Sequence, residues 1–145
     1  VNNSIHTYIC KAKRIDNNKW VYGLLCYNIY KQLCIQPLDN MSCCVIDPST
    51  ICRRTGKEDK YGNPIFENDI CKVDFPYGPF DDNGGYELRT RVAICEFDQF
   101  SAEFMCISEY GDMYKWYGTG MYSDVKDELV EVIGNRFDDT ELMEE

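Results

Sequence analysis

The most regular feature of the chain is an alternation of apolar and polar residues with a period of two. Between residues 70 and 75, Cys71, Val73 and Phe75 are separated by the charged residues Lys72 and Asp74. In an extended strand this spacing places the three apolar side chains on one face, so the segment predicts a strand with one buried face. Similar segments, bounded by Asn, Asp, Gly and Pro, predict a mainly β protein with little helix.

Turn residues divide the N-terminal third into short strands. Trp20–Cys26 is apolar at almost every position, which indicates either burial on both faces or an exposed aromatic surface. The polar segment Arg14–Lys19 contains two asparagines, which tolerate left-handed backbone angles, and is typical of a hairpin turn. By the same reasoning we expect further strands at Ile5–Lys13, Ile29–Gln36, Met41–Ile46, Leu88–Phe97 and Glu103–Ser108.

The C-terminal part is less regular. Asp124–Val132 fits one or two helical turns, whereas Val130–Ile133 within it also fits a strand, and the pattern leaves both interpretations open. We expect ordered structure to end at Asn135–Phe137 and an exposed acidic tail to follow at residues 138–145. No repeat or linker interrupts the chain, so residues 1–145 are expected to form one domain.

Charge is distributed unevenly along the 145 residues. Lys and Arg total 15 against 25 Asp and Glu, a net charge of −10, which argues against binding of duplex nucleic acid. Residues 1–60 nevertheless carry nine basic and five acidic side chains, a net +4, and the remaining residues carry −14. The basic part is interpreted as a solvated face, a pocket for an anionic ligand or a self-association surface.

The sequence shows no membrane or secretion signal. No apolar run reaches the roughly 18–20 residues that a membrane helix needs. The first residues, Val1–Ser4, have neither the basic nor the apolar region of a secretory signal. We therefore expect a cytoplasmic protein without a membrane partner.

Nine cysteines and a single histidine limit the possible chemistry. The cysteine count is odd, no C-x-x-C pair occurs, and most thiols lie among apolar residues, so we expect reduced cysteines in the core. Adjacent Cys43 and Cys44 would point to opposite faces of a strand and make a poor chelate. His6 is the only histidine, which removes most Ser-His and Cys-His schemes. We expect no catalytic residue, no metal site and no cofactor.

The candidate ligand-binding residues lie in two segments. Arg53, Arg54 and Lys57 flank a Thr-Gly pair, and arginine forks beside a glycine suit phosphate oxygens, although the segment lacks the P-loop pattern. Trp20 and Tyr22 share one face of the predicted strand and could stack on an aromatic ligand. The alternatives are a solvated turn for the basic group, and core or subunit-interface burial for the aromatic pair.

Three segments resemble the YopX family, small proteins of phages and prophages. They are Lys13–Gly23, Ile46–Ile70 and Glu131–Phe137, and they occur in the family's order. The resemblance implies a small SH3-type β-barrel in about residues 56–137, opening at Glu67–Val73, after an N-terminal β-hairpin region in about residues 1–55. It also implies a phage or prophage origin and self-association, but no catalytic residue.

The leading functional hypothesis is a non-enzymatic phage or prophage protein that works by binding a host or phage component, and so modulates a host process or defence. A first alternative is an oligomer that sequesters an anionic nucleotide signal through Arg53, Arg54 and Lys57, with Trp20 or Tyr22 stacking. A second alternative is a hydrolase that uses carboxylates, since pairs of acids for such chemistry are recognised by their spatial separation rather than by sequence.

Overall fold

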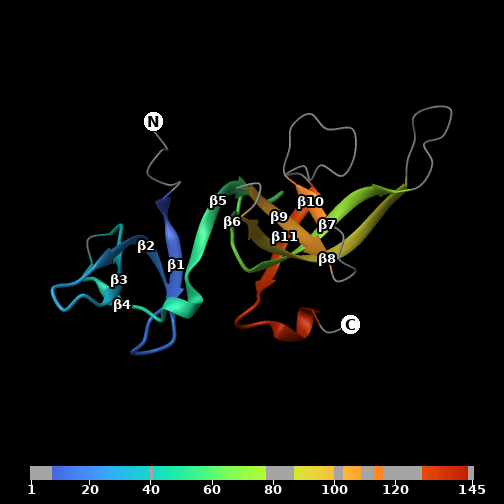
Figure 1. The fold of residues 1–145 in the computed structure, drawn as a ribbon. Coiled ribbons are helices and arrows are strands. Elements are labelled where there is room, and N and C mark those ends of the chain that lie inside the picture. The colour runs from blue at the N-terminus through green and yellow to red at the C-terminus, as the bar shows by residue number, and fades with distance from the viewer. Residues whose placement is uncertain are drawn as a thin grey trace. The chain divides into compact units, whose positions relative to one another are not determined.

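The computed structural model describes residues 8–39, 41–77, 87–99, 103–108, 113–115 and 129–143. The chain divides into two compact units, Val1–Gly56 and Lys57–Glu145, and both are built mainly from β-strands (Figure 1). His6 and the first residues of the strand predicted at Ile5–Lys13 lie outside the described residues.

An antiparallel sheet forms the first unit. Its strands are β1 (Cys10–Lys13), β2 (Trp20–Tyr27), β3 (Leu33–Pro37), β4 (Cys44–Val45) and β5 (Cys52–Glu58). They run in the order β4-β3-β2-β1-β5. β5 continues past Gly56 into the second unit, and its neighbour in the sheet, β6 (Pro64–Phe66), belongs to that unit. A short 3-10 helix, η2 (Pro48–Thr50), precedes β5, and the Asp47 side chain caps its start by accepting a hydrogen bond from Ser49 N.

Asparagines shape the turns of two hairpins in this sheet, β1–β2 and β2–β3. The turn predicted at Arg14–Lys19 is confirmed: Asn18 has a φ of +58° and its N–H donates to Arg14 O. β3 begins at Leu33 rather than at Ile29, so the predicted start is wrong. The reason is local, because Asn28 Oδ1 accepts hydrogen bonds from the N–H groups of two residues that follow it, and so forms a turn instead of a strand.

One face of this sheet contributes a small core. Ala12, Ile35 and Ile46 are at most 1% exposed, and partly buried apolar side chains of the same unit pack against them. On β2, in contrast, Tyr22 is 50% exposed and Leu25 is 41% exposed. Burial of β2 on both faces is therefore wrong, and the alternative of an exposed aromatic surface holds.

A second antiparallel sheet forms the other unit. Its strands are β7 (Asp69–Tyr77), β8 (Glu87–Asp98), β9 (Glu103–Ser108), β10 (Met113–Lys115) and β11 (Val130–Asn135), in the order β10-β9-β8-β7-β11. The alternation predicted for residues 70–75 is confirmed where side chains are described, since Cys71 and Val73 are fully buried and Lys72 is exposed. These two residues form the core with Ile65, Ala93, Cys95 and Val130.

The mainly β prediction is confirmed, but a closed SH3-type barrel is not found in the residues that the structure describes. The end strands of the second sheet each pair on one side only, β10 with β9 and β11 with β7. Val130–Asn135 is a strand, so the strand interpretation is confirmed from Val130 onward, whereas residues 124–128 of the alternative helical segment lie outside the described residues. Order also continues past Phe137, because Thr140–Met143 forms a 3-10 helix, η4, and Asp139 accepts a hydrogen bond from Asn135 N.

Within the described part of the chain, no helix has the length and apolar character needed to cross a membrane.

A buried carboxylate ties the start of the second unit to its last strand. Asp59 is 5% exposed and accepts four hydrogen bonds. Three come from Tyr61 and Asn63 in the turn that follows, and one comes from Val132 N on β11. Burial raises the pKa of Asp59, but the hydrogen bonds from Asn63, Val132 and Tyr61 outweigh it, so the pKa lies below its ordinary value.

We expect Asp59→Asn to lower the free energy of unfolding by about 2–3 kcal/mol at pH 7, because an amide replaces one acceptor oxygen by a donor in a buried site. A carboxylate with a depressed folded-state pKa stabilises the fold above its unfolded pKa of about 3.9, and this contribution is lost as pH falls through the lower folded pKa. The difference between wild type and Asp59→Asn should therefore be complete at pH 7 and shrink below about pH 4. Urea unfolding at several pH values measures it.

The matched control is Asp16→Asn, which changes the same group on the surface. The pKa of Asp16 is also lowered, chiefly by its hydrogen bonds with Arg14, but this carboxylate is fully exposed. We expect almost no change in stability, since exposed ion pairs contribute little. Equal losses for the two variants, or a loss in Asp59→Asn that is the same at pH 3 and pH 7, would contradict this account.

Candidate functional site

The first unit carries an open groove of about 460 Å³ beside β2. We call it the Trp20 groove. Aromatic and apolar side chains make most of its wall, and Arg14 and Asp39 are its charged members. The other lining residues are Ile9, Trp20, Val21, Tyr22, Pro37, Leu38, Met41 and Cys44.

Close approach of two strands shapes this groove. Gly23 on β2 pairs with Pro37 on β3. A Cβ atom at Gly23 would lie only 2.1 Å from the backbone oxygen of Gln36, so no other residue fits here without a shift of the backbone. The absence of a side chain therefore lets β2 and β3 come together where Tyr22 and Pro37 line the groove.

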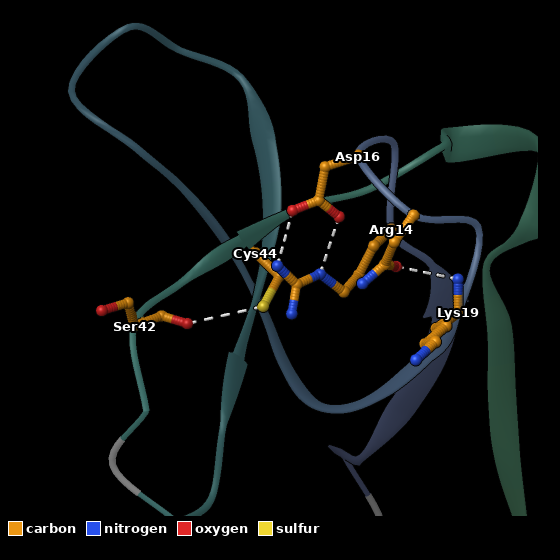
Figure 2. A network of polar contacts seen from close by, with 6 residues as sticks. Arg14, Asp16, Lys19, Ser42 and Cys44 are labelled. Carbon is orange, nitrogen blue, oxygen red and sulfur yellow. Dashed lines mark hydrogen bonds and ion pairs between the residues drawn. The ribbon is translucent and has the colours of Figure 1, made fainter.

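An exposed ion pair orients the basic member of the groove. Arg14 Nε and Nη2 donate to the two carboxylate oxygens of Asp16 at 2.9 and 2.6 Å, a two-pronged contact visible in Figure 2. The hydrogen bonding of Arg14 to Asp16, and then the neighbouring Cys44, raise the pKa of Arg14 above its ordinary value. Cys44 itself donates to Ser42 O at 3.5 Å. The guanidinium is thus held in one orientation by a geometry that suits a planar fork.

Two lysines flank Trp20. Strand register pairs Lys11 with Tyr22 and Lys13 with Trp20, so all four side chains lie on one face of the sheet. The Nζ atoms of Lys11 and Lys13 lie 4.8 and 5.4 Å from the centre of a Trp20 ring, within cation–π range. Both lysines are buried, at 7% and 8% exposed, which is uncommon for this residue type.

The candidate residues from the sequence fall into three places. Trp20 and Tyr22 line the groove. Arg53 and Arg54 are successive residues of β5 and therefore point to opposite faces. Arg53 pairs with Cys10, whereas Arg54 shares its face with Cys52, the partner of Lys11. Lys57 belongs to the second unit, and none of the three basic residues lines the groove.

Sequence reasoning counted Lys11 and Lys13 among the basic residues of the N-terminal part but did not place them beside Trp20, although a signal was available. Once Arg14–Lys19 is read as a hairpin turn, the antiparallel register follows. Counting back from the turn places Lys13 opposite Trp20 and Lys11 opposite Tyr22, as observed. The charge of the N-terminal part thus gathers on the same face as its exposed aromatic residues.

The cysteines are partly as expected. All eight whose side chains are described are free thiols, and five are buried: Cys10, Cys34, Cys52, Cys71 and Cys95. Burial, followed by the neighbouring Cys71, raises the pKa of Cys95 well above its ordinary value, so this thiol is unreactive. The expectation of core packing is wrong for Cys26, Cys43 and Cys44, which are partly or fully exposed. In the described residues, no group of three or more His, Cys, Asp or Glu is placed to hold a metal ion.

The second unit has a smaller, more polar cavity of about 280 Å³. Its charged side chains largely face one another. Lys60 Nζ lies 3.3 Å from Glu131 Oε2, and the Thr90 hydroxyl donates to the Asp74 carboxylate. These side chains therefore interact with one another within the cavity wall.

The fold and the groove define a small, mainly β protein with an aromatic surface site. A family model described as "YopX protein" matches residues 11–144. Because the match covers nearly the whole chain, the protein belongs to the YopX family, and the resemblance drawn from the three sequence segments is confirmed. No curated protein gives a significant match to the chain.

We expect Gly23→Ala to lower the free energy of unfolding by about 3 kcal/mol, because the new methyl group meets backbone rather than a movable side chain. Thermal or urea unfolding measures the loss. Gly56→Ala is the contrasting variant: Gly56 has a φ of +82° but open space around its Cβ position. It should cost only about 1 kcal/mol of backbone strain. A smaller loss for Gly23→Ala than for Gly56→Ala would refute the close-approach argument.

Proposed function

We propose that this protein works by binding rather than by catalysis, and that the Trp20 groove takes a small ligand with a planar ring and an anionic group, of the nucleotide class. The observation that carries the proposal is the position of Trp20. Its side chain lines the groove, and two lysine ammonium groups lie within 5.4 Å of its ring.

The groove has the size and lining that such a ligand needs. Small-molecule sites usually have volumes of about 300–1,000 Å³, with apolar walls and a few polar groups. The Trp20 groove, at about 460 Å³, falls in this range. Tyr22 is half exposed, and with Trp20 it offers aromatic surface on which a base can stack.

Charge favours an anionic ligand on this unit. Residues 1–56 carry seven basic and three acidic side chains, a net +4, whereas residues 57–145 carry eight and 22, a net −14. The potential near the groove is therefore more positive than the net charge of the whole chain suggests. Arg14 supplies a guanidinium in the wall, and Lys11, Lys13 and Arg54 lie on the sheet face that carries Trp20.

The biological role is inferred from membership of the family. Membership of the YopX family suggests a phage-type protein of unassigned function. We infer that it acts in the cytoplasm of a bacterial host, as a self-associating protein that modulates a host process by sequestering the ligand of the groove. A carboxylate hydrolase is less well supported, because the two buried acids among the described residues serve the backbone. Asp59 and Asp69 accept hydrogen bonds from main-chain N–H groups.

The proposal is tested by calorimetric titration of the intact protein with cyclic nucleotides and ADP-ribose-type nucleotides. We expect Trp20→Ala to weaken binding by about tenfold or more, the usual effect of removing one stacking partner. Arg54→Ala should weaken it less, by a few-fold. Arg53→Ala removes the same charge from the face opposite to Trp20, Lys11 and Lys13, so it should weaken binding less than Arg54→Ala does.

Circular dichroism on each variant separates lost binding from lost folding. If the folded wild-type protein binds none of the nucleotides, the ligand class is wrong. If binding occurs but Arg53→Ala weakens it as much as Trp20→Ala does, the ligand lies elsewhere than in the Trp20 groove.

A further inference from the structure

Two exposed or partly exposed thiols lie side by side at the surface of the first unit. Cys26 is near the end of β2, and Cys43 immediately precedes β4. Their Sγ atoms are 3.8 Å apart although 17 positions separate them in the sequence. Cys43 is exposed and Cys26 is partly exposed, so reagents in solution can reach the pair.

Strand register explains how the two thiols meet. Cys44 pairs with Ile35 on β3 and shares the face of that core residue. Cys43 therefore turns to the opposite face, where the Cys26–Cys34 pair lies. The Cys43 thiol also donates to Gln36 Oε1 at 2.9 Å, and Gln36 Nε2 donates to Met41 O at 2.8 Å. Gln36 thus holds the segment before β4 beside Cys26.

Each of the other described cysteines is either buried or directed away from the Cys26–Cys43 pair. Cys34 is on the same face, but it is 1% exposed and its thiol donates to Gln32 O. Cys44 faces away, next to Arg14, and donates to Ser42 O. The remaining described thiols are buried. One pair of thiols in the described chain is therefore both accessible and close.

We propose that Cys26 and Cys43 form a dithiol that closes to a disulfide in exchange with a low-molecular-weight disulfide. The thiolate of Cys43 attacks the small disulfide, forms a mixed disulfide and releases one small thiol. Cys26 then attacks the Cys43 sulfur, gives its proton to the departing thiolate and releases the second thiol. Two protein thiols are oxidised and one small disulfide is reduced to two thiols, so electrons and protons balance.

Two observations assign this order of attack. Cys43 is the more exposed thiol, so the small disulfide reaches it first. Burial, and then the hydrogen bond with Cys43, raise the pKa of Cys26, which makes Cys26 the slower first nucleophile. Closing the bond requires the sulfur atoms to move from 3.8 Å to about 2.05 Å. Residues 41–43 belong to no strand and can supply this movement.

The test equilibrates the intact, reduced protein with mixtures of reduced and oxidised glutathione. Wild type and Cys44→Ser should each lose two free thiols, and Cys26→Ser and Cys43→Ser should not. Trypsin places Cys26 on the peptide Trp20–Lys31 and Cys43 on Gln32–Arg53. A cross-link between these peptides is expected in wild type and in Cys44→Ser. A cross-link that persists in Cys43→Ser would overturn the assignment.

A second measurement on wild type alone does not depend on the folding of any variant. The ratio of internal disulfide to dithiol varies as the concentration of oxidised glutathione divided by the square of the concentration of reduced glutathione, so at a fixed ratio of the two forms it varies inversely with their total concentration. Diluting both forms tenfold should therefore raise the ratio of disulfide to dithiol about tenfold. A stable glutathione adduct would not respond to dilution, and that result would show that the two sulfurs cannot close.

Closure should also be visible in stability. A cross-link over 17 positions restricts the unfolded chain, so the oxidised wild-type protein should melt roughly 5 °C or more above the reduced form. Cys43→Ser should melt at one temperature under both conditions. An oxidised wild type that melts lower than the reduced form would mean that the disulfide distorts the native fold, against the proposal.

Discussion

The second unit depends on the buried carboxylate of Asp59, whose lost contacts with water are replaced mainly by hydrogen bonds from main-chain N–H groups. Asp59 collects N–H groups from its own turn and from Val132, 73 positions later. The contact with Val132 fixes the position of β11, which pairs with β7 at the end of the sheet. Asp69 and Asp139 repeat the device on a smaller scale, each accepting from a backbone N–H nearby. Some of the acidic side chains of this chain therefore order the backbone by accepting its N–H groups.

Much of the fold could be predicted because strands impose a period of two on any sheet with one buried face. The strand at 69–77 follows that pattern where its side chains are described, whereas the strand at 20–27 is apolar at almost every position and was recognised from its turn boundaries. Boundaries failed where a side chain competes with the strand for backbone hydrogen bonds, as Asn28 does. Periodicity could not predict whether the sheet closes into a barrel. Alternation specifies which face of a strand is buried, but not whether the first and last strands of the sheet pair.

The candidate site was predictable only in part, for a related reason. Trp20 and Tyr22 could be placed on one face from their spacing alone, whereas Lys11 and Lys13 required the hairpin register as well. Residues that are neighbours in sequence point to opposite faces of a strand: this was expected for Cys43 and Cys44, but Arg53 and Arg54 were grouped as one site. Grouping residues by charge along the chain therefore joined side chains that the sheet separates. The contact between Cys26 and Cys43 reaches across β3, which lies between β2 and β4, and no local sequence pattern predicts it.

The outermost strands of both sheets are short. β4 has two residues, and β6 and β10 have three each. β11 is longer, but its register shifts between Val132 and Gly134, which interrupts the row of hydrogen-bonding groups. Long, flat borders are the places where proteins rich in sheet recruit further copies into fibrils. In the described residues, short or interrupted border strands therefore offer little backbone for a further copy to pair with.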